Sequence, residues 1–277
     1  MSSILVKGPP VLIIAEAGIN HGGDYTKAMK MAEFAKHGGA DIVKFQTYNT
    51  AKLLRANHKD FDTLAGLELS RERWKELARF CEAIEIEFLT TPGELDSLKF
   101  AVEELGVKRI KIGSDDLTNR PLLDEADQTG LPLIISTGMA TPSEIRDAIY
   151  GLNKISLLHC VSLYPCRPDQ ANLRSIEYLR NTYGCRVGYS DHTACSDVVM
   201  AAVAAGAEII EFHFKLNATK PIDDPVSFDV TELHRLVYDI RELELILGSY
   251  GKKPNTQELA QAPQLRKGAD GYRGQVA

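Results

Sequence analysis

The chain has 277 residues, 44% of them hydrophobic and 25% charged, and 32 basic against 38 acidic residues give a net charge of −6. An isoelectric point near 5.7 argues against the basic face of a general nucleic-acid binder. No apolar run approaches the roughly 20 residues of a membrane-spanning helix, and the N-terminus is too short and too interrupted by proline for a signal peptide. We therefore expect a cytoplasmic protein with neither a nucleic-acid nor a membrane partner.

The five cysteines are scattered and form no Cys-x-x-Cys pair. This spacing suits neither a disulfide framework nor a structural zinc site, so we interpret them as reduced thiols. Cys160 lies in an apolar stretch, where a small buried hydrophobic residue is expected more than a nucleophile.

Eight short β-branched segments recur along the chain. They are VLIIAEAG (11–18), ADIVKFQT (40–47), EIEFLTTP (85–92), VKRIKIGS (107–114), LPLIISTG (131–138), ISLLHCVS (155–162), CRVGYSDHT (185–193) and AEIIEFHF (207–214). Their nearly continuous apolar residues are typical of parallel strands buried on both faces. Segments of helical period separate them, for example 28–35 and 233–247. The alternation predicts an α/β fold, a single-domain (β/α)8 TIM barrel, with an open doubly wound sheet as the alternative.

Local signals divide the rest of the chain. Thr91-Pro92-Gly93-Glu94 and Thr141-Pro142-Ser143-Glu144 each predict a helix start, with threonine as N-cap and proline at the first helical position. Residues 50–70 have little periodicity and predict a functional loop or lid over the barrel mouth. Residues 252–277 are polar and show no clear period, so we expect a catalytic domain over 1–251 followed by a tail over 252–277.

Polar side chains stand at the C-terminal end of almost every predicted strand, where TIM barrels build their active sites. They are Glu16, Asn20, His21, Lys44, Gln46, Thr90, Thr91, Lys111, Ser114, Asp116, Ser136, Thr137, His159, Ser162, Tyr164, Ser190, Asp191, His192, Glu211 and His213. This convergence predicts an enzyme active site in the barrel mouth.

Two lysines, Lys44 and Lys111, end the second and fourth strands. Buried cations repel each other and lose hydration unless an anion neutralises them, so a phosphate or carboxylate ligand is expected between them. The alternative is a structural network in which each lysine pairs with a carboxylate such as Glu16 or Asp116.

Two histidines, His192 and His213, end the seventh and eighth strands, which are neighbours in a closed barrel. Neutral imidazole is the commonest ligand of divalent transition metals, and two ligands leave coordination positions open for catalysis. A metal site and a pair of satisfied core histidines both fit this pattern, whereas His159 is expected in the core.

The segments AEAGINHGG, KFQT, LTTP, KIGSDDLTN, ISTGM, LLHCVSLYP, VGYSDHT and IEFHF occur in this order between about Val11 and Leu247. They resemble the motifs of the sialic acid (N-acetylneuraminate) synthases, a family of phosphoenolpyruvate-condensing transferases that make nonulosonic acids. GYSDHT and the Asn-His-x-Gly loop are the most specific parts of the resemblance.

The resemblance implies a role for each matching residue. His192 and His213 would bind a divalent metal, Mn²⁺ by preference, with Mg²⁺, Co²⁺ or Zn²⁺ as alternatives. Glu16 matches the acidic residue that faces the reacting carbons. Phosphoenolpyruvate would be bound by Lys44, Thr91, Lys111, Ser114, Ser162 and Ser190. The residues that would contact the sugar, or the water bound to the metal, are Asn20, His21, Gln46, Asp116, Tyr164 and Asp224.

The implied reaction joins phosphoenolpyruvate, water and an open-chain sugar aldehyde like N-acetylmannosamine, and it gives a nonulosonic acid such as N-acetylneuraminate and phosphate by C–O cleavage. One alternative keeps this donor with another acceptor, as in other 3-deoxy-2-keto sugar acid synthases. A second is a Schiff-base aldolase built on Lys111 or Lys44, and a third is a non-catalytic barrel that binds a sugar acid.

Some positions depart from the family pattern. Ile222-Asp223-Asp224 stands where Gly-Pro-Asp is usual, and Ser114-Asp115-Asp116 replaces Ser-x-Glu. We also expect no C-terminal antifreeze-like domain, which in the family completes the sugar site. A homodimer is implied by the resemblance, and a separate chain that caps the site stays open as an alternative.

Overall fold

The structure is a computed structural model that describes residues 9–217, 221–249, 251–269 and 271–274. Contacts divide the chain into one unit over Pro10–Ile246 and a terminal unit of Met1–Pro9 with Leu247–Ala277. This boundary lies close to the predicted division between residues 1–251 and 252–277. The first unit contains every residue that the sequence marks as functional.

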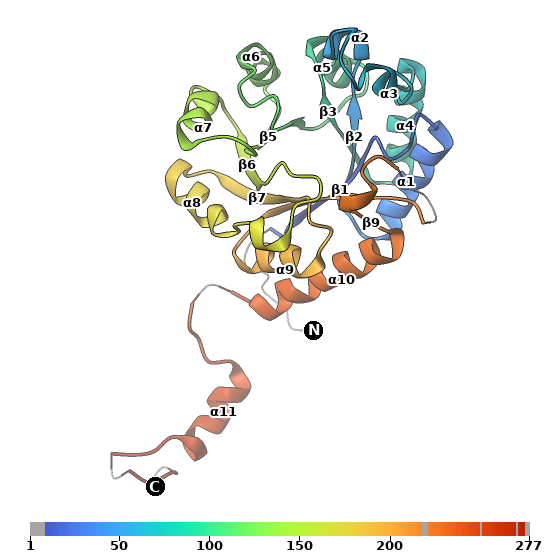
Figure 1. Cartoon of the computed structure of the whole chain (residues 1–277). Coiled ribbons are helices and arrows are strands. Elements are labelled where there is room, and N and C mark those ends of the chain that lie inside the picture. The colour runs from blue at the N-terminus through green and yellow to red at the C-terminus, as the bar shows by residue number, and fades with distance from the viewer. Residues whose placement is uncertain (1–8, 218–220, 250, 270, 275–277) are drawn as a thin grey trace. The chain divides into compact units, whose positions relative to one another are not determined.

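Eight parallel strands form the sheet of the first unit (Figure 1). They are β1 (Leu12–Gly18), β2 (Ile42–Thr47), β3 (Glu87–Pro92), β4 (Ile110–Ile112), β5 (Leu133–Ser136), β6 (Ile155–Cys160), β7 (Arg186–Asp191) and β8 (Ile209–Phe214). Hydrogen bonds join them in the order β3-β2-β1-β8-β7-β6-β5-β4, and a short β9 (Ser227–Phe228) pairs with β8. β3 also contacts β4, so the ring is nearly closed. The predicted TIM barrel is confirmed, and the open sheet is excluded.

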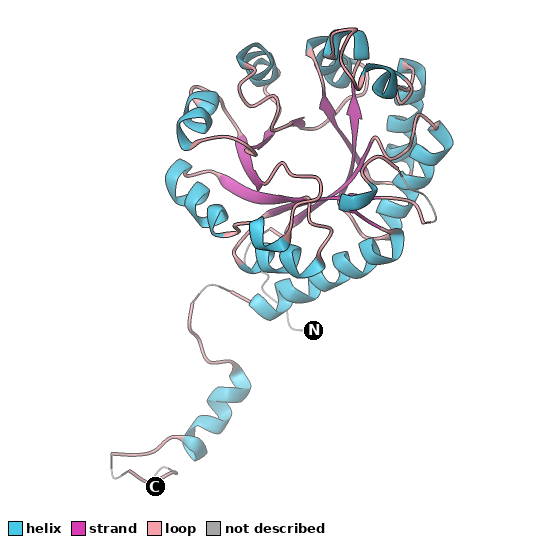
Figure 2. Cartoon of the chain, in the orientation of Figure 1, coloured by secondary structure: helices cyan, strands magenta, loops and turns pink. Residues whose placement is uncertain are grey.

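Helices surround the ring of strands (Figure 2). They are α1 (Tyr25–His37), α4 (Arg71–Ala83), α5 (Leu95–Glu103), α6 (Arg120–Gln128), α7 (Pro142–Ile149), α8 (Arg174–Tyr183), α9 (Ser196–Ala204) and α10 (Val230–Leu247). The predicted apolar stripe of α1 is fully buried against the strands. On α10 the stripe is buried through Ile240, but Leu247 at its end is 51% exposed.

Apolar side chains close the inside of the barrel below its mouth. One buried cluster takes a residue from each of six strands: Ile14, Ile42, Leu89, Ile134, Leu158 and Ile209. β7 contributes Gly188 instead, because a Cβ atom there would overlap Ile209 and lie 2.7 Å from Leu158 Cδ2. Side chains alternate along a strand, so the residue two positions further on also faces inward, one layer nearer the mouth. Five of those six positions hold Glu16, Lys44, Thr91, Ser136 and Glu211.

One of the two predicted helix starts is confirmed. Thr141 caps α7 in a capping box with Glu144. The other prediction is wrong, because Thr91 and Pro92 extend β3 by pairing with β2, and α5 begins only at Leu95 with Glu94 as its N-cap. The Thr-Pro-Gly-Glu pattern fits both states, and the strand pairing decides between them.

Two segments that lack a clear period contain short helices. Residues 50–70 hold α2 (Thr50–Leu53) and α3 (Phe61–Ala65), anchored where Tyr48 Oη donates to Leu64 O over 3.1 Å. The tail holds α11 (Thr256–Leu265), whose N-cap Asn255 accepts from the backbone N–H of Glu258. Within the described ranges, no helix has both the length and the apolar character that crossing a bilayer requires.

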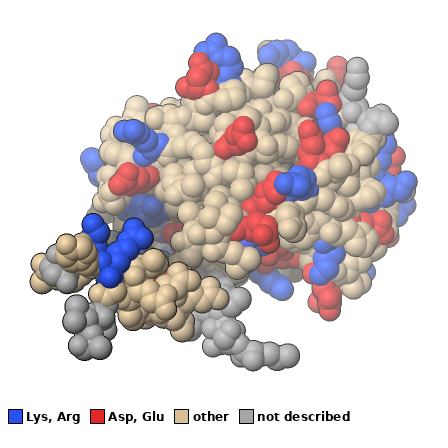
Figure 3. All heavy atoms as spheres, turned by 90° about the horizontal axis from the view of Figure 1, so that it is seen from below, with Lys and Arg blue, Asp and Glu red and all other residues tan. Residues whose placement is uncertain are grey.

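The surface carries charges of both signs. On the face shown in Figure 3, lysine and arginine side chains are interspersed with aspartate and glutamate. No single basic stripe stands out on this face, in keeping with the acidic net charge of the sequence.

Candidate active site

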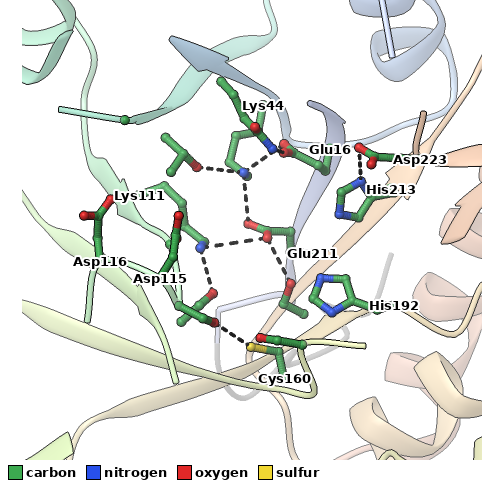
Figure 4. A pocket seen from close by; sticks show the side chains of 18 of the residues that line it. Glu16, Lys44, Lys111, Asp115, Asp116, Cys160, His192, Glu211, His213 and Asp223 are labelled. Carbon is green, nitrogen blue, oxygen red and sulfur yellow. Dashed lines mark hydrogen bonds and ion pairs between the residues drawn. The ribbon is translucent and has the colours of Figure 1, made fainter. Parts of the chain in front are cut away.

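A cavity of about 490 Å³ opens at the C-terminal ends of the strands (Figure 4). It contains all but three of the residues that the sequence assigns to the site. Those that line it are Glu16, Lys44, Gln46, Thr91, Lys111, Ser114, Asp116, Ser162, Tyr164, Ser190, His192 and His213. Of the other polar strand ends in the predicted convergence, Ser136 and Glu211 also line the cavity, whereas Thr90, Thr137, His159 and Asp191 do not.

Four buried charges alternate in sign across the floor of this cavity. Lys44 Nζ lies 2.9 Å from Glu16 Oε2 and 3.9 Å from Glu211 Oε2, and Lys111 Nζ lies 3.9 Å from Glu211 Oε1. None of the four side chains is more than 5% exposed. The pairing that the sequence offered as an alternative is thus present, but Lys111 faces Glu211 and not Asp116.

The two lysines differ in how strongly they hold their protons. Burial disfavours the charged form of Lys44, but the carboxylates of Glu16 and Glu211 outweigh burial and raise its pKa. For Lys111 burial dominates and lowers the pKa, although Glu211 opposes it. Burial also acts on Glu211, but Lys111 and Lys44 together hold its pKa below the usual value.

Hydroxyl groups complete the surroundings of the lysines. Lys44 Nζ donates to Thr91 Oγ1 over 2.9 Å, and Lys111 Nζ donates to Ser136 Oγ over 2.7 Å. Ser190 Oγ donates to Glu211 Oε1 over 3.0 Å. Ammonium and hydroxyl groups that gather at one end of a cavity are suited to a phosphate or carboxylate ligand.

His192 and His213 lie beside each other at the ends of the neighbouring strands β7 and β8, with ring centroids 5.5 Å apart. His192 Nδ1 lies 2.8 Å from the Val161 carbonyl oxygen, which can only accept, so Nδ1 carries the proton and Nε2 keeps its lone pair. Burial lowers the pKa of His192 to about 4, which keeps the ring neutral. His213 Nδ1 lies 3.3 Å from Asp223 Oδ2, and this carboxylate raises the His213 pKa against the effect of burial.

These donors fit a divalent metal bound by two imidazoles. A neutral ring whose second nitrogen is fixed by a carbonyl is the usual form of a histidine ligand. Among the residues that the structure describes, no three His, Cys, Asp or Glu side chains converge as a metal cage. Water or substrate would therefore complete the coordination, as in a catalytic site.

The loop after β7 orients His192 through a buried carboxylate. Asp191 is fully buried and accepts hydrogen bonds from Tyr189 Oη, Thr193 Oγ1 and the backbone N–H groups of Thr193 and Ala194. The Cys166 N–H donates to the carbonyl of His192 over 2.8 Å. The Ser-Asp-His-Thr segment is therefore held at several points.

A second polar cluster lies on the wall formed by β4, β5 and β6. The Gly138 N–H donates to Ser114 Oγ over 3.0 Å, and Ser114 Oγ lies 3.2 Å from Cys160 Sγ. A Cβ atom at Gly138 would overlap Ser162 Oγ and lie 2.8 Å from Ser114 Oγ. Cys160 is buried as expected and also lines the cavity, and burial raises its thiol pKa, which disfavours a nucleophilic role.

Three predicted residues lie outside the cavity. Asn20 Nδ2 donates to Phe214 O and Ser227 Oγ, and its Oδ1 accepts from the Asp223 N–H. Asn20 therefore holds the loop that carries Asp223, and does not itself line the site.

His21 and Asp224 also point elsewhere. His21 packs against Phe45 and Trp74 in the core, accepts from the Gly23 N–H, and has a pKa lowered by burial to about 4. Asp224 pairs with Lys215, and its neighbour Asp223 takes the place beside His213.

Several residues of the cavity were not assigned a role from the sequence. They are Ile19, Tyr48, Leu53, Gly93, Gly113, Asp115, Ser136, Met139, Cys160, Glu211 and Asp223. Ser136 and Glu211 are among the polar strand ends that the sequence places at the barrel mouth, although no specific role was given to either. Glu211 stands two residues before His213 on one strand and so shares its face. Met139 ends the ISTGM segment of the resemblance, which gave it no role, and no pattern in the sequence distinguishes Leu53.

Comparisons with known proteins agree with this geometry. A model of the NeuB family matches residues 31–252. N,N'-diacetyllegionaminic acid synthase of Legionella pneumophila is 40% identical over 89% of this chain and 76% of its own length. Human N-acetylneuraminate-9-phosphate synthase is 35% identical over 93% of this chain and 77% of its own. The chain thus spans about three quarters of the length of these two relatives.

A solved structure shares the fold over almost the same range. The N-acetylneuraminic acid synthetase of Leptospira borgpetersenii superposes with a TM-score of 0.88 at 36% identity, covering 91% of this chain and 90% of that one. Since the family model matches most of the chain and the relatives exceed 30% identity, the chain belongs to the NeuB family and is a synthase of the transferase class.

Proposed function

We propose that the protein condenses phosphoenolpyruvate with water and the open-chain aldehyde of an N-acyl hexosamine such as N-acetylmannosamine. The products are phosphate and a nonulosonic acid such as N-acetylneuraminate. The observation that carries the proposal is the pair of buried lysines, Lys44 and Lys111, beside Glu16 in a cavity that His192 and His213 also line. The two relatives are named as synthases of N-acylated sugar acids, which supports the choice of product class.

The lysine end of the cavity would hold the donor. Lys44 and Lys111 neutralise its phosphate and carboxylate, with Thr91 and Ser114 as hydroxyl donors beside them. Both ammonium groups already point into the cavity, because Glu16 and Glu211 hold them there. Little reorganisation is then needed when the donor binds.

Glu16 would act at the reacting carbons. C3 of phosphoenolpyruvate forms a bond to the aldehyde carbon, the aldehyde C=O electron pair becomes an alkoxide that takes up a proton, and positive character develops at C2. Water adds to C2 and loses a proton. The bond between C2 and the phosphate oxygen then breaks, phosphate leaves, and the C2 hydroxyl loses its proton to give the keto group. The Glu16 carboxylate lies at the end of β1 between Lys44 and Gln46, where it can stabilise the positive carbon or accept the proton of the water.

His192 and His213 would hold a divalent cation, Mn²⁺ by preference. When bound, such an ion supplies Lewis-acid polarisation of the aldehyde oxygen. The charges of the cavity favour an additional cation, since Glu16, Asp115, Asp116, Glu211 and Asp223 line it against only two lysines. The homodimer and a separate capping chain stay predictions.

Phosphate release from phosphoenolpyruvate, with Mn²⁺ present, tests the proposal across a panel of acceptors. The panel contains N-acetylmannosamine, diacetamido-trideoxyhexoses, mannose, arabinose 5-phosphate and erythrose 4-phosphate. We expect release with an N-acyl hexosamine, and ¹⁸O placed in the bridging C2–O position should appear in the phosphate. If phosphate is released only with another aldehyde, that aldehyde replaces the N-acyl hexosamine as the acceptor. If no member of the panel gives phosphate release, the proposed reaction is contradicted.

The same sample tests the Schiff-base alternative. Borohydride reduction in the presence of pyruvate should leave the protein mass unchanged. A stable adduct at Lys111, whose lowered pKa is compatible with a nucleophilic amine, would favour the aldolase.

A further inference from the structure

The turn that follows β5 places Met139 in a backbone conformation that long side chains rarely adopt. Its φ angle is +65°, in the left-handed region that favours glycine. The surrounding bonds enforce the turn: Thr137 Oγ1 donates to Leu158 O over 2.9 Å, and the Gly138 N–H donates to Ser114 Oγ. A strained residue that its neighbours hold in place at a cavity is a candidate for function.

The strained turn directs a large apolar side chain to the active-site cavity. Met139 lines that cavity and is nevertheless 72% exposed. Its strand lies between β4, whose following loop carries Asp115 and Asp116, and β6, which leads to Tyr164. Tyr164 is also exposed, by 59%, and its ring centroid lies 4.3 Å from that of His192. Met139 and Tyr164 therefore give the cavity an apolar wall next to its polar floor.

A methionine side chain offers a ligand only dispersion contacts and adaptable shape. It cannot recognise the phosphate, carboxylate or hydroxyl groups of the substrates, for which lysines and hydroxyls are already present. The apolar group available on an N-acyl hexosamine is the methyl of its acyl substituent. Burying that methyl against an otherwise exposed thioether removes apolar surface of both partners from water.

We propose that Met139 is a specificity-determining residue whose side chain packs against the acyl substituent of the acceptor sugar. The proposal rests on the proposed function and names the part of the acceptor that this wall recognises. The left-handed backbone at Met139 is the conformation in which the turn brings this residue to the cavity lining.

Two substitutions distinguish the contribution of the Met139 side chain from that of the turn conformation. Met139→Asn removes the apolar chain but keeps a residue that tolerates the left-handed conformation. Met139→Leu keeps an apolar chain of similar volume. For each variant, kcat/KM is measured with the N-acyl hexosamine that the wild type uses best and with its N-formyl counterpart, which lacks the methyl group. The KM for phosphoenolpyruvate is measured alongside.

The wild type should prefer the acetyl over the formyl acceptor by about fourfold, the factor expected for burying one methyl-sized group. Met139→Asn should lose this preference with an unchanged KM for phosphoenolpyruvate, and Met139→Leu should keep it. A preference that persists in Met139→Asn overturns the proposal, as does an equal loss for both acceptors with a raised KM for phosphoenolpyruvate. A wild type that uses no N-acyl acceptor contradicts the proposed function itself.

Discussion

Glu16 Oε2 lies 2.9 Å from Lys44 Nζ, and both side chains are almost completely buried. The register of the sheet creates this pair, because Glu16 of β1 stands opposite Lys44 of β2. The carboxylate keeps the lysine charged in a place where burial alone would favour the neutral amine. In the proposed reaction, Glu16 would therefore both keep the donor-binding lysine charged and act at the reacting carbons.

Replacing Glu16 by glutamine should lower kcat by about 100-fold or more, the usual contribution of an acid–base or charge-stabilising group. The KM for phosphoenolpyruvate should change less, since Glu211 still faces both lysines. Steady-state kinetics measures both constants. Glu87→Gln is the matched control, because Glu87 pairs with Arg109 outside the cavity, and its kcat should stay near that of the wild type. Equal losses in the two variants would contradict a catalytic role for Glu16.

The lowered pKa of Lys111 predicts how donor binding depends on pH. Only the ammonium form neutralises phosphate, so the KM for phosphoenolpyruvate should rise as pH increases through the lowered pKa, before an ordinary lysine with a pKa of about 10.4 would lose its proton. In Lys111→Arg the guanidinium keeps its charge to much higher pH. The KM of this variant, whatever its size at neutral pH, should vary less over the alkaline range. Parallel pH profiles for the two proteins would show that another group titrates.

Metal binding by the two histidines is testable without turnover. Mn²⁺ at about 100 times its Kd should raise the Tm of the wild type by about 5–10 °C, and a chelator should reverse the shift and abolish activity. His213→Ala should lose both the shift and the activity while it stays folded, because a strand-end ligand is removed without opening a core cavity. His159→Gln provides the control, since His159 is buried against the Ala171 carbonyl away from the cavity. A Tm shift that persists in His213→Ala would show that Mn²⁺ does not depend on this histidine for binding, and would contradict the proposed metal site.

Gly138 leaves the space in which Ser114 and Ser162 face the cavity. Gly138→Ala should destabilise the protein by about 1–3 kcal/mol, as overpacking does, and should raise the KM for phosphoenolpyruvate about tenfold by displacing the two hydroxyls. Removing the overlapping atom by a second change, Ser162→Gly, should restore part of the stability and activity. The effects of the two substitutions would then be non-additive, as expected for residues in contact. If the two substitutions change the free energy of unfolding and the KM additively, then residues other than Ser162 move to make room for the Cβ atom that Gly138→Ala introduces.

The barrel and the floor of its site could be predicted because both follow from regular strands. The apolar runs mark the strands, and the period of two places Lys44, Glu211 and His213 on the inner face near the mouth. The resemblance to sialic acid synthases added expected roles for Lys44 and His213, which spacing alone left open, but none for Glu211.

The remaining part of the site could not be predicted because it lies in turns. Gly18 at a φ of +52° ends the regular period of β1, so Asn20 and His21 face the β8 loop and the core. Asp223, and not Asp224, reaches His213 from the irregular segment between β8 and β9, where no strand or helix period predicts which carboxylate faces the site. Met139 depends on a left-handed turn that hydrogen bonds from two neighbouring strands enforce, and no local pattern encodes such a turn.

The pairing of β1 with β8 has a consequence for how the protein acquires activity. Glu16 stands opposite His213 in this pairing, although nearly the whole barrel sequence separates the two residues. An N-terminal fragment still emerging during synthesis can form helices and the first strands, but it lacks half of the site until the last strand closes against the first. Such a distant contact is formed late because ordering the intervening chain costs entropy. The moment at which enzymatic turnover first appears during refolding therefore reports when β8 has paired with β1 and the barrel has closed.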